Sequence, residues 1–128
     1  FAGCDARSAV TKALADPSCL MVNRNQGAGT RILLDRLLAG AKPEGYWNQP
    51  KSHNAVAAAV AQGRADWGMT IAPVAEAYGL AFLPFAEEHY DLALVTARKN
   101  RPAVQALLQS LQSEDTRAAL KAAGFTPA

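Results

Sequence analysis

A chain of 128 residues, half of them apolar and 19% charged, suits one packed domain of ordinary size. The formal charge of +2 comes from scattered basic residues without a lysine/arginine run, which argues against nucleic-acid binding by this segment. No apolar run approaches the roughly 20 residues of a membrane span, and the N-terminus lacks the pattern of a signal peptide. We therefore expect no membrane insertion and a cytoplasmic protein, with a periplasmic location as the alternative.

The N-terminal segment predicts a strand end at residues 1–4, followed by a helix to about Ala15. Asp5 can cap this helix, and Val10 and Leu14 lie four residues apart on one face.

Cysteines and histidines give no sign of a metal or cofactor. Cys4 and Cys19 are too few for a disulfide framework and lack zinc spacing, so we expect two small buried side chains. His53 and His89 have no partner at ligand spacing.

The most informative stretch, residues 20–38, runs from an apolar strand through a glycine-rich turn into an amphipathic helix. Gly27 and Gly29 have no side chains, so the backbone can come close to a ligand. The N–H groups and dipole of the first helical turn point at whatever lies there. Arg24 and Arg31 add charge that can pair with an oxyanion or carboxylate.

Each polar residue of this turn also has a plainer interpretation. Thr30 adds a hydroxyl for a ligand, or caps the helix of an ordinary strand–helix turn. Arg24 could be a surface residue, and Arg31 could point either way. Asn23 and Asn25 are typical of residues that hydrogen-bond the backbone of their own turn.

A second helix is expected to start at Ser52, His53 and Asn54, with Ser52 as its N-cap. Its N–H groups could serve the same ligand, and the alternative is a cap beside a solvated histidine. Ser52, His53 and Asp66 are a poor catalytic triad, because adjacent helical residues point about 100° apart.

The rest of the chain alternates apolar strands with helices, which indicates an α/β fold. Asp66 and Trp67 are placed near a strand end, where the indole could floor a ligand pocket or pack in a core or interface. The expected strands are residues 19–22, 65–71, 80–84 and 90–95. The expected later helices are residues 73–78, 104–111 and 114–123, the last capped by Ser113.

Residues 24–30 resemble the Arg-x-x-x-Ser-Gly-Thr loop of periplasmic phosphate- and tungstate-binding proteins, with Ala28 in place of serine. Together with residues 52–68, residues 22–31 are similar to a narrower family. It is the periplasmic-binding-protein-like domain fused to molybdopterin-biosynthesis proteins and to helix-turn-helix regulators of molybdate metabolism. The similarity runs from about Asp16 to the C-terminus. Because Ala28 lacks the hydroxyl, the N–H groups of Ala28 and Gly29 would carry more of the contact.

The resemblance implies a periplasmic-binding-protein type II-like mixed sheet with helices on both faces and a shortened first lobe. It implies one domain over residues 1–128, or a piece of a longer chain. The implied function is non-catalytic binding of a small anion, molybdate or tungstate first, in molybdate transport or molybdenum-cofactor regulation. Besides the small oxyanion, the expected partner is a second copy of this chain, in a homodimer, or a fused regulatory domain.

These arguments give one set of candidate ligand contacts and no catalytic residue. The set is Arg24, Gly27, Ala28, Gly29, Thr30, Arg31, Ser52, His53, Asn54, Asp66 and Trp67. Two other functions stay open: an enzyme acting on an anionic or pterin substrate through His53, and an interaction module with a vestigial pocket.

Overall fold

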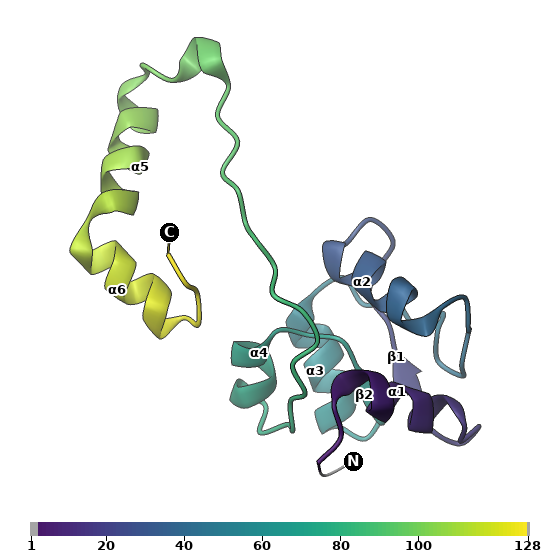
Figure 1. The fold of residues 1–128 in the computed structure, drawn as a ribbon. Helices are drawn as coiled ribbons and strands as arrows, with labels where there is room; N and C mark the ends of the chain where they lie inside the picture. The colour runs from purple at the N-terminus through teal and green to yellow at the C-terminus, as the bar shows by residue number, and fades with distance from the viewer. Residues whose placement is uncertain (1–2, 128) are drawn as a thin grey trace. The chain divides into compact units, whose positions relative to one another are not determined.

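The computed structural model describes residues 3–127, and the chain divides into two compact units, Phe1–Ala86 and Glu87–Ala128 (Figure 1). The first unit contains four of the helices and both strands of the described part of the chain. Its elements are α1 (Ala6–Leu14), β1 (Met21–Val22), α2 (Gly29–Leu38), α3 (His53–Ala61), β2 (Trp67–Gly68) and α4 (Ala72–Ala77).

The two short strands are parallel, with Met21 opposite Trp67 and Val22 opposite Gly68. The other edge of β1 is also occupied, because the N–H of Met21 donates to the Glu44 carbonyl at 3.0 Å. The loop of residues 43–51 therefore runs beside β1 and continues past its carboxyl end.

Helices cover both faces of this small sheet, as expected, but a mixed sheet was expected and the two strands of the described residues are parallel. Met21 packs with α1 and α2 in a core cluster made of Val10, Met21, Leu34, Leu38 and Tyr46. Val22 points to the opposite face and packs with Val56, Ala59 and Ala65, so α3 covers that side.

Residues 80–84 and 90–95 were expected to be strands, and this prediction is wrong for the described residues. Neither segment forms a strand in the structure. Leu92 is 66% exposed and Val95 63%, so the apolar pattern is present without a neighbouring strand to cover it. The strand expected over residues 65–71 is likewise limited to Trp67–Gly68.

The second unit contains a 3₁₀ turn, Thr96–Arg98, and the helices α5 (Pro102–Gln112) and α6 (Glu114–Ala122). The Ser113 hydroxyl accepts a hydrogen bond from the N–H of Thr116, which confirms the predicted cap. The Tyr90 and Phe125 rings meet edge to face, with centroids 5.9 Å apart.

The predicted caps of α1 and α3 are also confirmed. The Asp5 carboxylate accepts from the N–H of Ser8 at 2.9 Å, and the Ser52 hydroxyl accepts from the N–H of Ala55 at 3.1 Å. The bonds from Ser8 lower the pKa of Asp5, and the two capping bonds fix the starts of α1 and α3.

Replacing Ser52 by alanine is expected to lower the free energy of unfolding by about 1 kcal/mol, because the Ala55 N–H loses its acceptor. Urea denaturation followed by circular dichroism measures this loss. Ser18→Ala is an exposed control outside any helix or strand. A cost at position 52 no larger than at position 18 would contradict the capping role.

Within residues 3–127, no helix combines the length and apolarity needed to cross a membrane. Cys4 and Cys19 are free thiols, and both are half-buried, where full burial was expected. Gly3 and Cys4 form no strand, and residues 1–2 of the expected strand end lie outside the described residues.

Candidate functional site

The loop that follows β1 is held by its own asparagines. The buried Asn23 side chain donates to the Tyr46 carbonyl at 3.1 Å and accepts from the N–H of Arg24 at 2.8 Å. Asn25 donates to the carbonyl of Gln26 at 3.0 Å. The prediction that these asparagines bond the local backbone is confirmed.

The start of α2 leaves donors without acceptors. Gly27 has a φ of +84°, a conformation that glycine adopts easily, and Ala28 is the N-cap without a side-chain cap bond. The Ala28 N–H donates to the Asn25 carbonyl at 3.3 Å, so this amide is occupied within the turn. The N–H groups of Gly29 and Thr30 have no acceptor among residues 3–127.

Thr30 lies just inside the helix and is only 6% exposed. Because Ala28 occupies the N-cap position, the plainer interpretation of Thr30 as the cap is wrong. No described group forms a hydrogen bond with the Thr30 hydroxyl. The hydroxyl and the two amides therefore belong to one helix start and have no hydrogen-bond partner among residues 3–127.

Arg24 is the most unusual residue of the loop, because its charged side chain is only 8% exposed. One nitrogen, Nη2, reaches the Lys51 carbonyl at 3.5 Å, the limit of a hydrogen bond. Nε and Nη1 are buried without a partner in the described part of the chain. The one ion pair found there joins Arg31 to Asp35, so no carboxylate neutralises Arg24.

The contact with Lys51 places Arg24 beside the start of α3. The N–H of Asn25 donates to the Pro50 carbonyl at 3.2 Å, which brings the two loops together. The Ser52 hydroxyl is occupied by its capping bond, whereas the Asn54 N–H has no acceptor among the described residues. His53 is half-buried, and its carbonyl accepts from the Thr70 hydroxyl at 3.3 Å.

Arg31 points into the fold. Nε donates to both oxygens of Asp35 at 2.9 and 2.8 Å, Nη1 donates to the Arg24 carbonyl at 2.9 Å, and Nη2 donates to the Tyr46 hydroxyl at 2.6 Å. Burial works to lower the pKa of Arg31, but the bonds to Asp35 and Tyr46 outweigh it, so the pKa is raised. Each nitrogen of Arg31 therefore has a partner inside the protein.

Asp66 and Trp67 lie away from these groups, at the amino end of the strands. Asp66 pairs with Leu20, donating its N–H at 2.8 Å and accepting through its carboxylate at 2.7 Å. Trp67 begins β2 rather than ending it, and its ring packs against the core cluster of Met21 and Tyr46.

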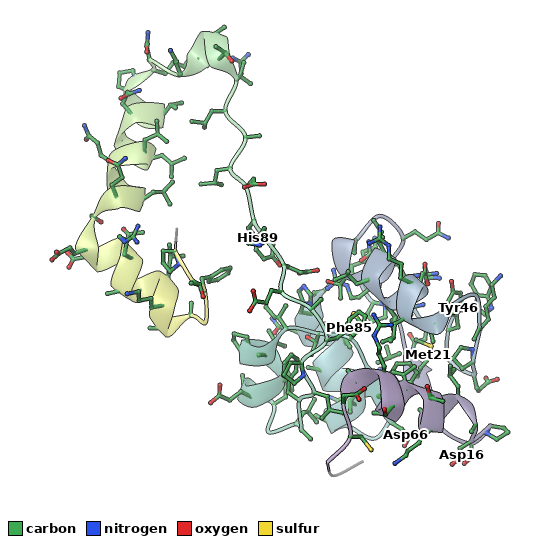
Figure 2. All side chains as sticks on the ribbon, viewed as in Figure 1. Asp16, Met21, Tyr46, Asp66, Phe85 and His89 are labelled. Atoms are coloured by element: carbon green, nitrogen blue, oxygen red, sulfur yellow. The ribbon has the colours of Figure 1, made fainter. Side chains whose placement is uncertain are left out.

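Figure 2 labels Asp66 on the same side of the first unit as Asp16. Burial raises the pKa of the Cys19 thiol, and the carboxylates of Asp66 and Asp16 raise it further. The structure thus groups Asp66 with Asp16 near Cys19, an unfavourable environment for an anion.

Sequence reasoning missed three residues around the loop. Thr70 follows β2, and the carboxyl ends of parallel strands are where ligands bind in α/β folds, so a shorter predicted strand would have singled it out. Tyr46, in the loop of residues 43–51, was expected to flank a pocket or partner surface or to pack on an exposed loop, and was not counted among the candidate contacts. Its carbonyl bonds Asn23, and its ring and hydroxyl contact Arg31. Asp35 could have been predicted as a partner of Arg31, because residues four apart on one helix are neighbours and can form an ion pair.

A hollow of about 260 Å³ in the first unit is lined by Asp5, Ala6, Arg7, Pro84 and Phe85, none of them a candidate residue. Among residues 3–127, no group of three His, Cys, Asp or Glu side chains is arranged to hold a metal ion.

Comparisons with known proteins agree with the resemblance at the level of the superfamily. A model of the PBP superfamily domain matches residues 3–112. The uncharacterised protein YvgK of Bacillus subtilis (strain 168) is 35% identical over 105 residues, which is 78% of this chain and 33% of YvgK. The chain thus spans about a third of that relative. No solved structure matches the chain.

Proposed function

The chain belongs to the periplasmic-binding-protein (PBP) superfamily, and from that premise we propose that it binds a small oxyanion reversibly. The proposed site lies around Arg24, between the first turns of α2 and α3. Domains of this superfamily generally bind ligands rather than catalyse reactions. We propose no catalytic residue here.

The observation that carries the proposal is the buried guanidinium of Arg24 with Nε and Nη1 unpartnered. An isolated buried charge costs several kcal/mol, and natural folds keep such groups paired. A bound oxyanion would supply both the missing charge and the missing acceptors. Charge-assisted bonds from arginine to an oxyanion are among the strongest in proteins.

Neutral donors would complete the binding of such an anion. The free N–H groups of Gly29 and Thr30, the Thr30 hydroxyl and the free N–H of Asn54 belong to the first turns of α2 and α3. Both helix dipoles are positive at these ends. Arg31, Asp66 and Trp67 are omitted from the proposed contacts, because their polar groups are engaged or lie at the other strand end.

Molybdate and tungstate are the first ligands to test, because residues 24–30 resemble the loop of known oxyanion-binding proteins. We further propose that residues 1–128 belong to one ligand-binding domain of a longer protein of molybdate transport or molybdenum-cofactor regulation. Sulfate and phosphate share the tetrahedral shape and differ mainly in size and protonation.

The wild-type protein is expected to melt at a higher temperature with at least one of molybdate, tungstate, sulfate or phosphate. A ligand at about 100 times its Kd adds about 2.7 kcal/mol to the free energy of unfolding. Differential scanning fluorimetry at constant ionic strength, with chloride as the balancing anion, measures the shift. Flat melting temperatures across all four anions would refute the proposal.

A further inference from the structure

Arg31, Asp35 and Tyr46 form a connected group next to the candidate site, here called the Arg31 cluster. The Tyr46 hydroxyl accepts one bond from Arg31 and donates to Asp35 at 3.0 Å. The Arg31 guanidinium also lies over the Tyr46 ring, 4.6 Å from its centroid. Arg31 and Tyr46 are both buried, whereas Asp35 is partly exposed.

The cluster holds the backbone on both sides of the Arg24 side chain. Arg31 donates through Nη1 to the Arg24 carbonyl at 2.9 Å. The Tyr46 carbonyl accepts from the side chain of Asn23, the residue before Arg24, at 3.1 Å. Asn23, which opens the loop, and Arg24, whose guanidinium has two unpartnered nitrogens, are therefore tied to the same cluster.

Arginine is the one side chain that suits this position. Its planar guanidinium presents five donors in fixed directions, which lets one group reach a carboxylate, a hydroxyl and a carbonyl at once. Lysine would keep the charge but would lose the fixed geometry and the stacking on Tyr46. We therefore expect Arg31→Lys to make the loop around Arg24 less ordered, although the charge of the protein is unchanged.

We propose that Arg31, with Asp35 and Tyr46, is a positioning residue that holds Arg24 and the α2 amides in the geometry that binds the oxyanion. This inference rests on the proposed function and goes beyond it, since it takes Arg31 out of the ligand contacts. A side chain that positions another contributes to affinity through the order of the loop. It makes no charge contact of its own.

The test compares Arg31→Lys and Tyr46→Phe with the wild type in isothermal titration calorimetry, using the oxyanion that gives the largest melting shift. Arg36→Lys is the matched control, because Arg36 is exposed on the same helix. The Kd is expected to rise at least about tenfold in both cluster variants and to stay unchanged in Arg36→Lys. Its salt dependence should stay that of the wild type, because Arg24 keeps its charge.

Amide hydrogen exchange supplies a readout that needs no ligand. The N–H groups of Asn25 and Ala28 are bonded in the loop, and both are expected to exchange faster in Arg31→Lys and Tyr46→Phe. The Val104 N–H, in the second unit, serves as the internal reference. If the wild type binds no oxyanion, the proposed function fails, and exchange alone decides whether the cluster orders the loop.

Two results would overturn the inference. Unchanged exchange at Asn25 and Ala28 in the cluster variants would show that the loop does not depend on Arg31. A lower melting temperature with an unchanged Kd, measured where the protein is fully folded, would show a purely structural role. Tyr46→Phe keeps the test usable if Arg31→Lys does not fold, because it removes one hydroxyl and leaves the ring.

Discussion

Alanine at position 45 is expected to lower the free energy of unfolding by about 4 kcal/mol or to prevent folding of the first unit. Gly45 has a φ of +85°, which a residue with a side chain adopts only at a cost of about 1–2 kcal/mol. A Cβ there would overlap the Met21 carbonyl oxygen and lie 3.0 Å from the carbonyl carbon. Met21 belongs to β1 and pairs with Trp67, so its backbone has little room to move.

Gly40→Ala is the matched control for this substitution, because Gly40 has a φ of +91° and open space where the Cβ would lie. It should cost about 1 kcal/mol from conformation alone. Urea denaturation followed by circular dichroism gives both values. Equal costs at the two positions would mean that the loop of residues 43–51 moves away from β1 easily, contrary to the close packing described above.

Helices of this protein could be predicted from sequence because their signals are local. Asp5, Ser52 and Ser113 each cap a helix start as predicted, and apolar residues repeat with helical spacing in α2 and α5. Capping bonds and helical periodicity depend on residues within one or two turns of one another. A single sequence contains all the information that these features require.

Strands were predicted less completely, because a strand exists only beside a partner. The strands β1 and β2 lie within the expected residues 19–22 and 65–71, but residues 80–84 and 90–95 form no strand. Residues 90–95 have the composition of a strand, yet no neighbouring backbone pairs with them among the described residues. The strand β2 forms because Gly68 has no side chain and fits against Val22 and Val56. A Cβ at position 68 would lie 2.8 Å from a side-chain carbon of each valine. That fit involves residues far apart in sequence.

The candidate site shows the same division. The glycine-rich turn and the two helix starts were evident from residue types, but the opposite environments of Arg24 and Arg31 were not. Arg31 has a carboxylate, a phenol and a carbonyl as partners, and Arg24 has one marginal bond. This difference depends on where Tyr46 lies, and the position of Tyr46 is set by loop contacts with β1.

Arg24→Met is expected to have two opposite effects, because the substitution removes a buried charge and keeps a long side chain. Without ligand, the free energy of unfolding should rise by about 2 kcal/mol, since an unpaired buried guanidinium is replaced by an apolar group. The melting shift caused by oxyanion should disappear, because the remaining N–H donors carry no net charge. Thermal melting with and without anion measures both effects on one sample.

Arg36→Met, on the exposed side of α2, controls for the loss of one positive charge from the molecule. It should leave both the melting temperature and the anion-dependent shift close to those of the wild type, because exposed charges contribute little.

The combination of higher stability and lost anion binding in Arg24→Met distinguishes a binding residue from a structural one. Replacing a structural arginine lowers the stability of the protein, as we expect for Arg31. Replacing a residue that is kept for its ligand raises the stability of the protein and abolishes binding. Lower stability of Arg24→Met with an intact anion shift would place the anion elsewhere and refute the site.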